Sequence, residues 1–502
     1  MNALHRTPVR PPLPVPHGAR TPRGLRAVER RVARADPAIR HGVRRLLVLL
    51  LLMPLLLVLL LLMPLLLVLA HHTARLPRLS LPVCYGLVVL AGTITLLYIA
   101  YSRYEDPAEG ELRVRPGPEE TFPPLPAHPM VAFLLAVKDE VDGIEACVRS
   151  MAASDCPGVR IVVVDDHSQD GTRDVLRRLE DDLGITVVYL DANVGKKHAL
   201  VRACEFAADT EIIAFTDSDC VLAPDALRRC VRALVTHPEL GAVSGHCRAL
   251  NTDSGFLARA QDVWYEGQFR VSKAAEASFG SVSCVSGPLA VFRRDAIFNY
   301  LPAWADDRFM GAPFRFATDR QLTGYVLGQA WRGQALKRRY AGSPFTAEDF
   351  AERRWRVGYV RSAKVWTDVP ARLGPLLRQQ VRWKKSFVRN LFFTGSFMWR
   401  RGPGAAALYY GHVLWVLAAP VMAFSHLVWA PAHGALFLTL LYLCGVVLKG
   451  CVWGLAYRID HPGDSRWRYR PLMSLFSSVL LAWLLPYSLL TVRRGVWSRG
   501  AA

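Results

Sequence analysis

The chain has 502 residues, 52% of them hydrophobic, and a formal net charge of +20. This length and composition suffice for one sizeable soluble domain and leave apolar sequence over for a bilayer. The positive charge does not indicate nucleic-acid binding, because eleven arginines lie within residues 1–45 and most of the other basic residues flank apolar segments. The sequence also contains no helix-turn-helix, zinc-finger or base-stacking motif.

Residues 1–45 are rich in Arg and Pro without apolar periodicity, which predicts a disordered basic tail. The uncharged, Leu-rich run 46–70 is long enough, at about 1.5 Å per residue, to cross a hydrocarbon core of about 30 Å. A second apolar run covers 81–101. We therefore predict two transmembrane helices within 46–104; a signal peptide fits less well, because the first run is too long and a second follows.

Between residues 130 and 345, short β-rich runs alternate with helical stretches. This alternation predicts an α/β domain whose mostly parallel sheet is covered by helices. The runs expected to be strands are 131–137, 160–165, 185–190 and 212–217. Ligands of such sheets bind beyond the carboxyl ends of the strands, where four aspartates fall: Asp165, Asp166, Asp217 and Asp219.

Residues 346–402 are basic and aromatic, which predicts amphipathic helices at the membrane interface. Within 403–492, three further apolar segments are separated in part by a loop with four arginines at 458–470, which belongs on the inner side. Five crossings would leave the C-terminus outside, whereas the basic tail 493–502 prefers the inside. Either the last segment breaks at Pro486 and returns to the inner side, or all five segments cross and the C-terminus lies outside.

The acidic candidates suit a metal and a nucleotide. Asp219, with Asp217 beside it, is a candidate ligand for Mg²⁺ or Mn²⁺, because hard cations prefer carboxylate oxygens, although such a pair alone is more often a turn. Asp165 and Asp166 offer carboxylates to a uracil or ribose, or else cap a helix. Lys196 and Lys197 offer positive charge to a diphosphate, or else lie in a solvated loop. Together with the four aspartates named above, these two lysines form one candidate donor pocket.

A candidate general base is Asp319, which opens a helical pattern and has Arg320 beside it as a substrate-binding candidate. Capping of that helix is the alternative role. The nearby acidic pair at 306–307 is expected to be a surface loop. The residues Cys284 to Leu289 predict a tight turn, with Ser286 and Gly287 as substrate contacts.

Gln379, Arg382 and Trp383 lie at i, i+3 and i+4, so one helical face presents all three. An amide, a guanidinium for phosphate and an indole for a sugar ring form a candidate site for acceptor and diphosphate. An interfacial anchor of Trp and Arg is the alternative.

As a set, these motifs resemble the processive family 2 glycosyltransferases, in particular hyaluronan synthases and chitin or chitooligosaccharide synthases. The resemblance covers roughly 131–390 and implies a GT-A fold in a cytosolic domain inserted between transmembrane helices. It also implies inverting transfer from UDP-sugar donors to a growing polysaccharide, which the same chain exports through a channel. The implied setting is a multi-pass protein of the plasma membrane, with the lipid bilayer as a partner and no nucleic acid.

By this resemblance, Asp165 and Asp166 hold the uridine, Asp217 and Asp219 the metal diphosphate, and Asp319 is the base. Phosphate contacts fall to Lys196 and Arg382, and Trp383, Ser286 and Gly287 line the acceptor entrance.

The chain also departs from hyaluronan synthases. Ala317 and Thr318 stand where those enzymes commonly have Gly-Asp before Asp-Arg, and a C-terminal Trp-Gly-Thr-Arg motif appears only as Trp497 to Gly500. Hyaluronan, made from UDP-N-acetylglucosamine and UDP-glucuronate, is the favoured product. A chitin-type N-acetylglucosaminyltransferase, a non-processive transferase with a lipid acceptor, and a catalytically silent export subunit remain alternatives.

Overall fold

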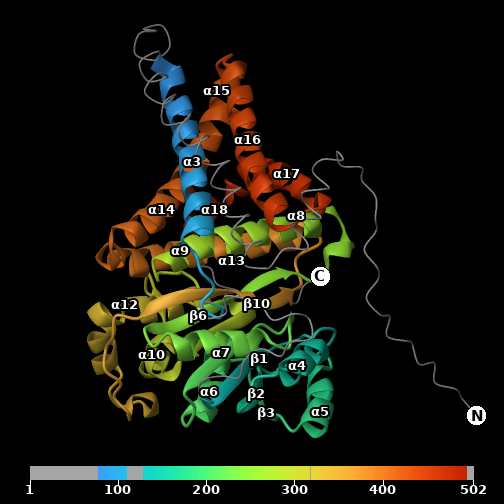
Figure 1. Ribbon diagram of the computed structural model, residues 1–502, viewed down its shortest axis with the longest axis vertical. Helices are drawn as coiled ribbons and strands as arrows, with labels where there is room; N and C mark the ends of the chain where they lie inside the picture. Colours follow the sequence, from blue (N-terminus) through green and yellow to red (C-terminus); the bar gives the residue numbers. More distant parts are fainter. Residues whose placement is uncertain (1–76, 110–127, 317, 494–502) are drawn as a thin grey trace, which may run out of the picture.

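The computed structural model describes residues 77–109, 128–316 and 318–493. They form an α/β domain and a helical bundle, with the helices α8, α9 and α13 lying across the boundary between the two (Figure 1). The predicted tail 1–45, the predicted span 46–70 and residues 494–502 lie outside the described part of the chain.

The α/β domain is built on an eight-stranded sheet with the order β3-β2-β1-β4-β7-β6-β10-β5. Strands β1 to β4 are parallel to one another, and β6 is parallel to β10, whereas β7 and β5 run antiparallel to their neighbours. The strands are β1 (Val131–Val137), β2 (Val159–Asp165), β3 (Thr186–Tyr189), β4 (Ile212–Thr216), β5 (Cys220–Leu222), β6 (Leu240–Ala249), β7 (Ala290–Arg293) and β10 (Arg356–Thr367). This arrangement confirms the predicted GT-A-type, mostly parallel sheet.

The central strands are buried on both faces, which explains their continuous apolar sequence. Every residue of β1 is buried, and helices pack on both sides of it. The helices of this domain and its boundary are α4 (Ile144–Ala152), α5 (Thr172–Leu183), α6 (Lys196–Cys204), α7 (Ala226–Thr236), α8 (Phe256–Gly267), α9 (Ala274–Ser278), α10 (Arg294–Ile297), α11 (Leu301–Ala305), α12 (Thr318–Arg339) and α13 (Leu373–Phe393). A small hairpin, β8 (Arg308–Phe309) with β9 (Ala312–Pro313), precedes α12.

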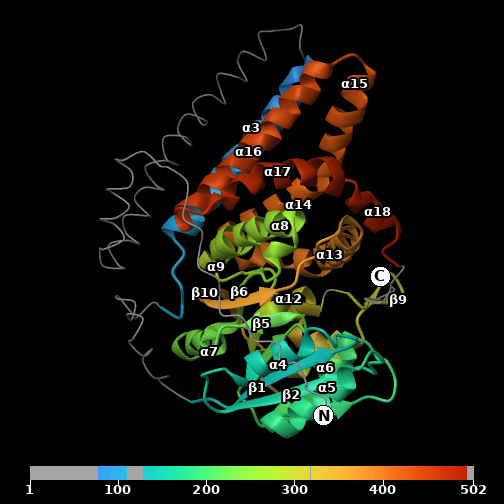
Figure 2. The ribbon, with the colours of Figure 1, turned by 90° about the vertical axis from the view of Figure 1, so that its right-hand side faces the viewer.

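The prediction of interface helices throughout 346–402 is wrong for β10. This strand pairs in parallel with β6 and carries β-branched and aromatic residues whose burial alternates after Val360. Arg and Trp are common both in interfacial helices and at sheet edges, so composition misled here. The helix α13 does occupy the second half of the range and lies between sheet and bundle (Figure 2).

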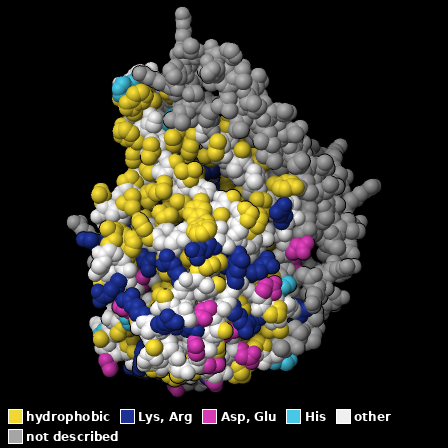
Figure 3. All heavy atoms as spheres, turned by 90° about the vertical axis from the view of Figure 1, so that its left-hand side faces the viewer, with side chains coloured by type: hydrophobic (Ala, Val, Ile, Leu, Met, Phe, Trp, Pro, Cys, Tyr) yellow, Lys and Arg dark blue, Asp and Glu magenta, His cyan; other side chains and the backbone are white. Residues whose placement is uncertain are grey.

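Four helical segments are long and apolar enough to cross a membrane: Tyr85–Ser102, Pro403–Ala432, Leu436–Asp460 and Ser465–Leu490. The first belongs to α3 (Pro77–Ser102), and the others contain α14 (Pro403–Phe424) with α15 (Ala430–Ala432), α16 (Leu436–Asp460), and α17 (Tyr469–Phe476) with α18 (Leu484–Leu490). Figure 3 shows hydrophobic side chains gathered over the bundle and a row of Lys and Arg directly below them. This distribution matches a membrane belt with a basic rim on the side of the α/β domain.

The last apolar segment bends back toward the α/β domain. A π-helical stretch and a break separate α17 from α18, and both stay near the boundary helices while α3, α15 and α16 extend away (Figures 1 and 2). Leu485 and Val492 share one buried cluster with Phe387 and Val388 of α13. The break falls before Leu484 and not at Pro486, and the side of the membrane on which the chain ends stays a prediction.

Candidate active site

Asp217 and Asp219 follow β4 and lie at the carboxyl edge of the sheet. Oxygens of both carboxylates and the Cys220 sulfur lie within 4.8 Å of one another. Thr367, at the end of β10, donates its hydroxyl to Asp219 Oδ1 at 3.2 Å. Burial, followed by the charge of Asp217, raises the pKa of Asp219 to about 6. The two strand ends thus create a partly desolvated site with excess negative charge.

Two cations from separate helices face this pair. Lys196, the first residue of α6, donates its ammonium to Asp217 Oδ1. Burial acts to lower the pKa of Lys196, but Asp217, Asp219 and Asp319 together raise it above its ordinary value. For Arg382 of α13, burial lowers the pKa, although Asp217 and Asp219 act in the opposite direction. The structure therefore brings these five residues, widely separated in sequence, into one electrostatic environment.

The predicted turn at Ser286 and Gly287 packs directly on the acidic pair. A Cβ at Gly287 would lie 2.6 Å from Asp217 Oδ2, so this close approach requires glycine. The Ser286 N–H donates to Ser244 Oγ at 3.3 Å, and the hydroxyl of Thr216 donates to the Pro288 carbonyl at 2.8 Å. The turn is thereby fixed on both sides of the Asp217 carboxylate.

Asp165 and Asp166 lie at the end of β2, as predicted, and both are buried. Asp165 accepts a hydrogen bond from Arg173 Nε at 2.6 Å. Asp166 accepts from the backbone N–H groups of Val194 and Gly195 at 2.7 and 2.9 Å, and burial raises its pKa. Asp166 consequently fixes the loop that leads into α6 and presents Lys196 to the site.

Lys197 lies in a different environment from Lys196. Its buried ammonium donates to Asp307 Oδ2 at 3.2 Å, Gln321 Oε1 at 2.6 Å and the Phe314 carbonyl at 2.8 Å. Three acceptors match its three protons, so its charge is committed to an internal anchor. The expectation of a surface loop at 306–307 is wrong for Asp307, which is buried and also pairs with Arg389 Nη2 at 2.6 Å.

Asp319 lies in the first turn of α12. The thiol of Cys284 donates to its Oδ2 at 3.3 Å, and the Arg320 N–H donates to its Oδ1 at 2.8 Å. Burial, followed by the charge of Asp319, raises the pKa of Cys284 to about 12, so the thiol remains protonated and orients the carboxylate as a neutral donor. Lys273 supports this arrangement by donating its ammonium to the Cys284 carbonyl.

Gln379, Arg382 and Trp383 occur on one helix, α13, as predicted. Trp383 is 41% exposed and packs against Trp264 and Tyr265 of α8, with ring centroids 5.9 and 6.1 Å away. The Gln379 side chain lies on the same helix as Trp383, and its Oε1 has no hydrogen-bond partner among the described residues. An open aromatic surface beside an unused acceptor atom suits a sugar ring.

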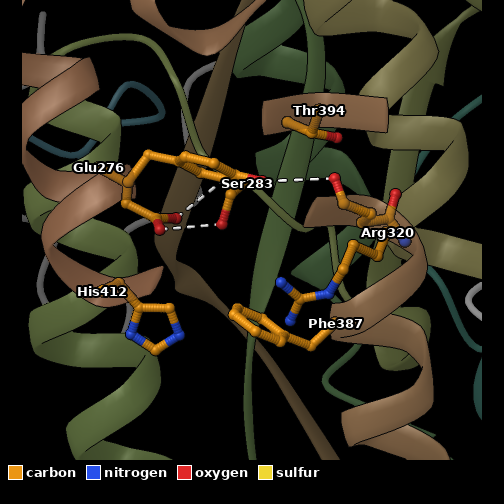
Figure 4. Close-up of a pocket in the computed structure, with 8 residues that line it drawn as sticks. Glu276, Ser283, Arg320, Phe387, Thr394 and His412 are labelled. Carbon is orange, nitrogen blue, oxygen red and sulfur yellow. Dashed lines mark hydrogen bonds between the residues drawn. The ribbon is translucent and has the colours of Figure 1, made fainter. Parts of the chain in front are cut away.

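Arg320 lies on a polar hollow behind Asp319. Figure 4 shows the Arg320 guanidinium and the Phe387 ring pointing into it, opposite the Glu276 carboxylate and the His412 ring. Glu276 accepts hydrogen bonds from the backbone N–H and hydroxyl of Ser283 at 3.0 and 2.9 Å. The hollow lies where α9, α12, α13 and the span α14 meet.

The residues at the end of β4 fit a hard divalent cation. The oxygens of Asp217 and Asp219 are close enough to share one ion, and the pKa of Asp219 is raised first by burial and then by the charge of Asp217, which a bound cation would offset. The Cys220 thiol is not a third ligand of this kind, because burial holds its pKa well above the usual range and Mg²⁺ and Mn²⁺ prefer oxygen.

Some residues of the site were not singled out from the sequence. Adjacent aromatic residues in a helical stretch were a usable signal for Trp264 and Tyr265. Thr367 and Glu276 offered no such signal, because no local sequence pattern marks them. Their positions follow only from the packing of the sheet and the boundary helices.

Comparisons with known proteins converge on one family. The model of "Glycosyl transferase family 2" matches residues 133–301. An N-acetylglucosaminyltransferase of Rhizobium meliloti is 31% identical over 284 residues, which cover 55% of this chain and 60% of that protein. A hyaluronan synthase of Streptococcus pyogenes is 24% identical over 379 residues, covering 74% and 83%. The chain thus spans about three fifths of the length of the former relative.

Among solved structures, the mannosyltransferase PcManGT from Pyrobaculum calidifontis, in complex with GDP-Man and Mn²⁺, has a TM-score of 0.46 and 20% sequence identity. The match covers 81% of this chain and 97% of that one.

Proposed function

Residues 133–301 form a family 2 glycosyltransferase domain, and on this premise we propose that the whole chain is a membrane-integrated processive glycosyltransferase. It polymerises UDP-sugars by inverting transfer and exports the polysaccharide between its own helices. One observation carries the proposal: Asp217, Asp219, Lys196, Asp319 and Arg382 share one environment directly below the candidate spans.

The donor lies along the carboxyl edge of the sheet. Asp165 and Asp166 border the uridine, and Lys196 and Arg382 neutralise the oxygens of the diphosphate. A divalent cation held by Asp217 and Asp219, either Mg²⁺ or Mn²⁺, supplies Lewis-acid stabilisation to the departing UDP. Lys197 does not contribute a contact of this kind, because its protons are used by Asp307, Gln321 and the Phe314 carbonyl.

Asp319 is the general base. The acceptor hydroxyl gives its proton to the Asp319 carboxylate while its oxygen bonds to the anomeric carbon, and the bond from that carbon to the diphosphate oxygen breaks. This single displacement inverts the anomeric configuration. Cys284 holds one carboxylate oxygen by hydrogen bonding, which keeps the other side of the carboxylate aimed at the acceptor.

The acceptor stacks on Trp383, in the aromatic cluster with Trp264 and Tyr265. A processive enzyme must grip its product after every addition, and an exposed indole at the base of the bundle provides such a grip. The row of Lys and Arg below the apolar belt supports a cytoplasmic α/β domain in a plasma membrane (Figure 3).

N-acetylglucosamine is the donor sugar shared by the two best-supported products. Hyaluronan requires UDP-glucuronate as well, whereas a chitin-type product does not. The similarity to a named N-acetylglucosaminyltransferase keeps the second product open beside the first.

The decisive experiment supplies purified protein, with Mg²⁺ or Mn²⁺, with UDP-N-acetylglucosamine and UDP-glucuronate separately and together. Polymer formed only from both donors, and degraded by a hyaluronan lyase, identifies a hyaluronan synthase; polymer from the first donor alone identifies a chitin-type enzyme. A product of one added sugar on lipid would indicate the non-processive alternative. Absence of UDP release from any UDP-sugar would contradict enzymatic function and favour a silent export subunit.

A further inference from the structure

The helix α8 carries the aromatic side chains that pack against Trp383. The rings of Trp264 and Tyr265 have their centroids 5.9 and 6.1 Å from that of Trp383. The helix itself lies between β6 of the sheet and α17 of the bundle (Figure 2). A rotation or shift of α8 would therefore move the aromatic surface on which the acceptor is proposed to stack.

Two buried carboxylates lie on the opposite side of α8. Asp262 and Glu266, about one helical turn apart, are 1% and 3% exposed. At 100° per residue, they fall within about 40° of each other, and Trp264 lies about 160° away from both. Acidic side chains are almost never fully buried unless they are paired. The partners of these two carboxylates therefore determine how α8 is held.

Arg248 of β6 binds both carboxylates. Its Nε and Nη2 donate to the two oxygens of Asp262 at 2.7 and 2.6 Å, and its Nη1 lies 3.2 Å from Glu266 Oε2. His246, on the same face of the strand, has its Nε2 2.9 Å from this oxygen of Glu266. Burial, followed by the charge of Lys364, lowers the pKa of His246 to about 3, so the ring is neutral and donates its Nε2 proton. The planar fork of a guanidinium fits these acceptors, whereas a lysine could not bridge them in the same way.

The bundle reaches the same two carboxylates from the other side. Arg466, in the turn Ser465–Arg468 between α16 and α17, donates its Nη1 to Asp262 Oδ2 at 2.9 Å. His461, which follows α16, places its Nε2 3.1 Å from Glu266 Oε1. The two negative charges of α8 are thus matched by one arginine from the sheet and one from the bundle.

We propose that Arg248 and Arg466 are positioning residues for the acceptor, because they clamp α8 through Asp262 and Glu266 and so keep its aromatic side chains against Trp383. The inference rests on the proposed function and adds to it the residues that hold the acceptor surface in place. The donor residues belong to other elements, chiefly the end of β4 and the start of α6. Loss of the clamp should therefore weaken acceptor binding and leave donor binding intact.

The test measures initial rates of UDP release by the full-length protein in lipid nanodiscs, with UDP-N-acetylglucosamine, Mn²⁺ and an N-acetylglucosamine tetramer as acceptor. Arg248→Lys keeps the charge and loses the fork. We expect the KM of the tetramer to rise about tenfold, the equivalent of one charge-assisted hydrogen bond, with the Kd of UDP and the kcat at saturating tetramer unchanged. An unchanged tetramer KM, or equal changes in this KM and in the Kd of UDP, would overturn the clamp.

Arg160→Lys is the matched control. Arg160 makes the same bidentate contact with Asp209, at 2.7 and 2.8 Å, but at the opposite end of β2 from Asp165. The tetramer KM of this variant should equal that of the wild type.

A second pair of variants changes a more exposed side chain, so that folding is less at risk. The Arg466 side chain is 34% exposed. Arg466→Ala should raise the tetramer KM about fivefold, and Arg466→Lys, which keeps a charged donor for Asp262, should restore most of the wild-type value. A wild-type KM in Arg466→Ala, or equal defects in the two variants, would contradict the positioning role.

A spectroscopic measurement addresses the same contact without transfer. The rings of Trp264 and Trp383 are close enough to couple, so Trp264→Phe should change the near-ultraviolet circular dichroism. In the Arg248→Lys background this change should be smaller, because a displaced α8 no longer holds Trp264 against Trp383. An equal change in both backgrounds would show that the clamp does not position α8. Absence of UDP release by the wild type would instead contradict the proposed function, and the spectra would still decide whether the clamp holds the helix.

Discussion

Asp319 differs from Asp217 in its side-chain hydrogen-bond donor, which is a thiol. Cys284 bonds its Oδ2, whereas Asp217 is paired with the ammonium of Lys196. A neutral donor orients a carboxylate without suppressing its affinity for a proton as strongly as a cation does. At the residue scale, a neutral thiol thus orients the Asp319 carboxylate, whereas a cation is paired with Asp217.

Asp319→Asn should abolish polymer formation while leaving UDP binding nearly intact. The substitution keeps the size of the side chain and removes only the basic oxygen, so the rate should fall by about 10²-fold or more. Initial rates of UDP release, together with calorimetric titration of UDP, measure the two properties. Equal loss of both would indicate that Asp319 is structural.

Gly287→Ala should impair donor use. The new methyl would lie 2.6 Å from Asp217 Oδ2, so either the turn or the carboxylate must move. We expect a raised KM for the UDP-sugar and a weaker response to Mn²⁺. Gly342→Ala is the control, since a Cβ there meets no atom within 4 Å; if both variants behave alike, the close approach at Gly287 is unimportant.

The pKa of Asp219 predicts a pH dependence of the metal-free protein. A carboxyl group whose pKa is about 6 in the folded state, against about 4 when unfolded, destabilises the fold when ionised. This penalty is complete above about pH 6 and disappears as the pH falls toward 4. Mn²⁺ should therefore raise the unfolding temperature over that in EDTA at pH 7, and progressively less as the pH falls below 6. A shift independent of pH would contradict this assignment.

At the scale of elements, one buried carboxylate holds three parts of the domain together. Asp307, just before the β8–β9 hairpin, pairs with Lys197 of α6 at 3.2 Å and with Arg389 of α13 at 2.6 Å. Burial lowers the pKa of Lys197 to about 8, although Asp307 opposes this shift. The two neighbouring lysines consequently differ in role: Lys196 faces Asp217 in the candidate site, whereas Lys197 is bound to Asp307 inside the domain.

Asp307→Asn should destabilise the domain by about 3–5 kcal/mol, because it leaves two buried cations without their counter-charge. Thermal unfolding of the detergent-solubilised protein measures this loss. Asp306→Asn is the neighbouring control, because Asp306 is exposed and its partners lie at the surface: the Tyr340 hydroxyl at 2.9 Å, Arg308 at 3.5 Å and Arg339 at 3.8 Å. Similar unfolding temperatures for the two variants would argue against the anchor.

At the scale of the whole molecule, the bundle is locked to the α/β domain through Asp460 at the end of α16. Its carboxylate accepts the Tyr101 hydroxyl of α3 at 2.6 Å, and it pairs with Arg270 at 2.9 Å and with Arg361 of β10 at 3.1 Å. One side chain therefore connects two candidate spans with the sheet and with the segment that follows α8. The proposed coupling of transfer to export requires contacts of this kind, because they fix the position of the bundle relative to the α/β domain.

Asp460→Asn should loosen this connection. We expect a loss of about 3 kcal/mol of stability and faster proteolysis between α3 and the first strand, because buried Arg270 and partly buried Arg361 lose their shared partner. Unfolding temperature and limited trypsinolysis measure both effects. Asp253→Asn, at an exposed loop position, is the control. Unchanged proteolysis would show that other contacts hold the bundle in place.

The sequence by itself predicted the strands 131–137 and 212–217, of which the second ends one residue earlier in the structure. It also predicted the described apolar segments and the positions of Asp217, Asp319 and Trp383 on their elements. These features follow from local patterns, since burial of a strand or helix requires apolar residues at fixed spacing and acidic residues stand out where a strand ends.

Only the tertiary structure decided that Asp307 is buried, that Lys197 faces away from the acidic pair, that 356–367 is a strand and that α18 packs against α13. Each of these outcomes depends on partners far away in the chain: Arg389 for Asp307, β6 for β10, and α13 for α18. A charge is tolerated in the interior only when an opposite charge arrives there, and no local pattern specifies which distant residue that will be.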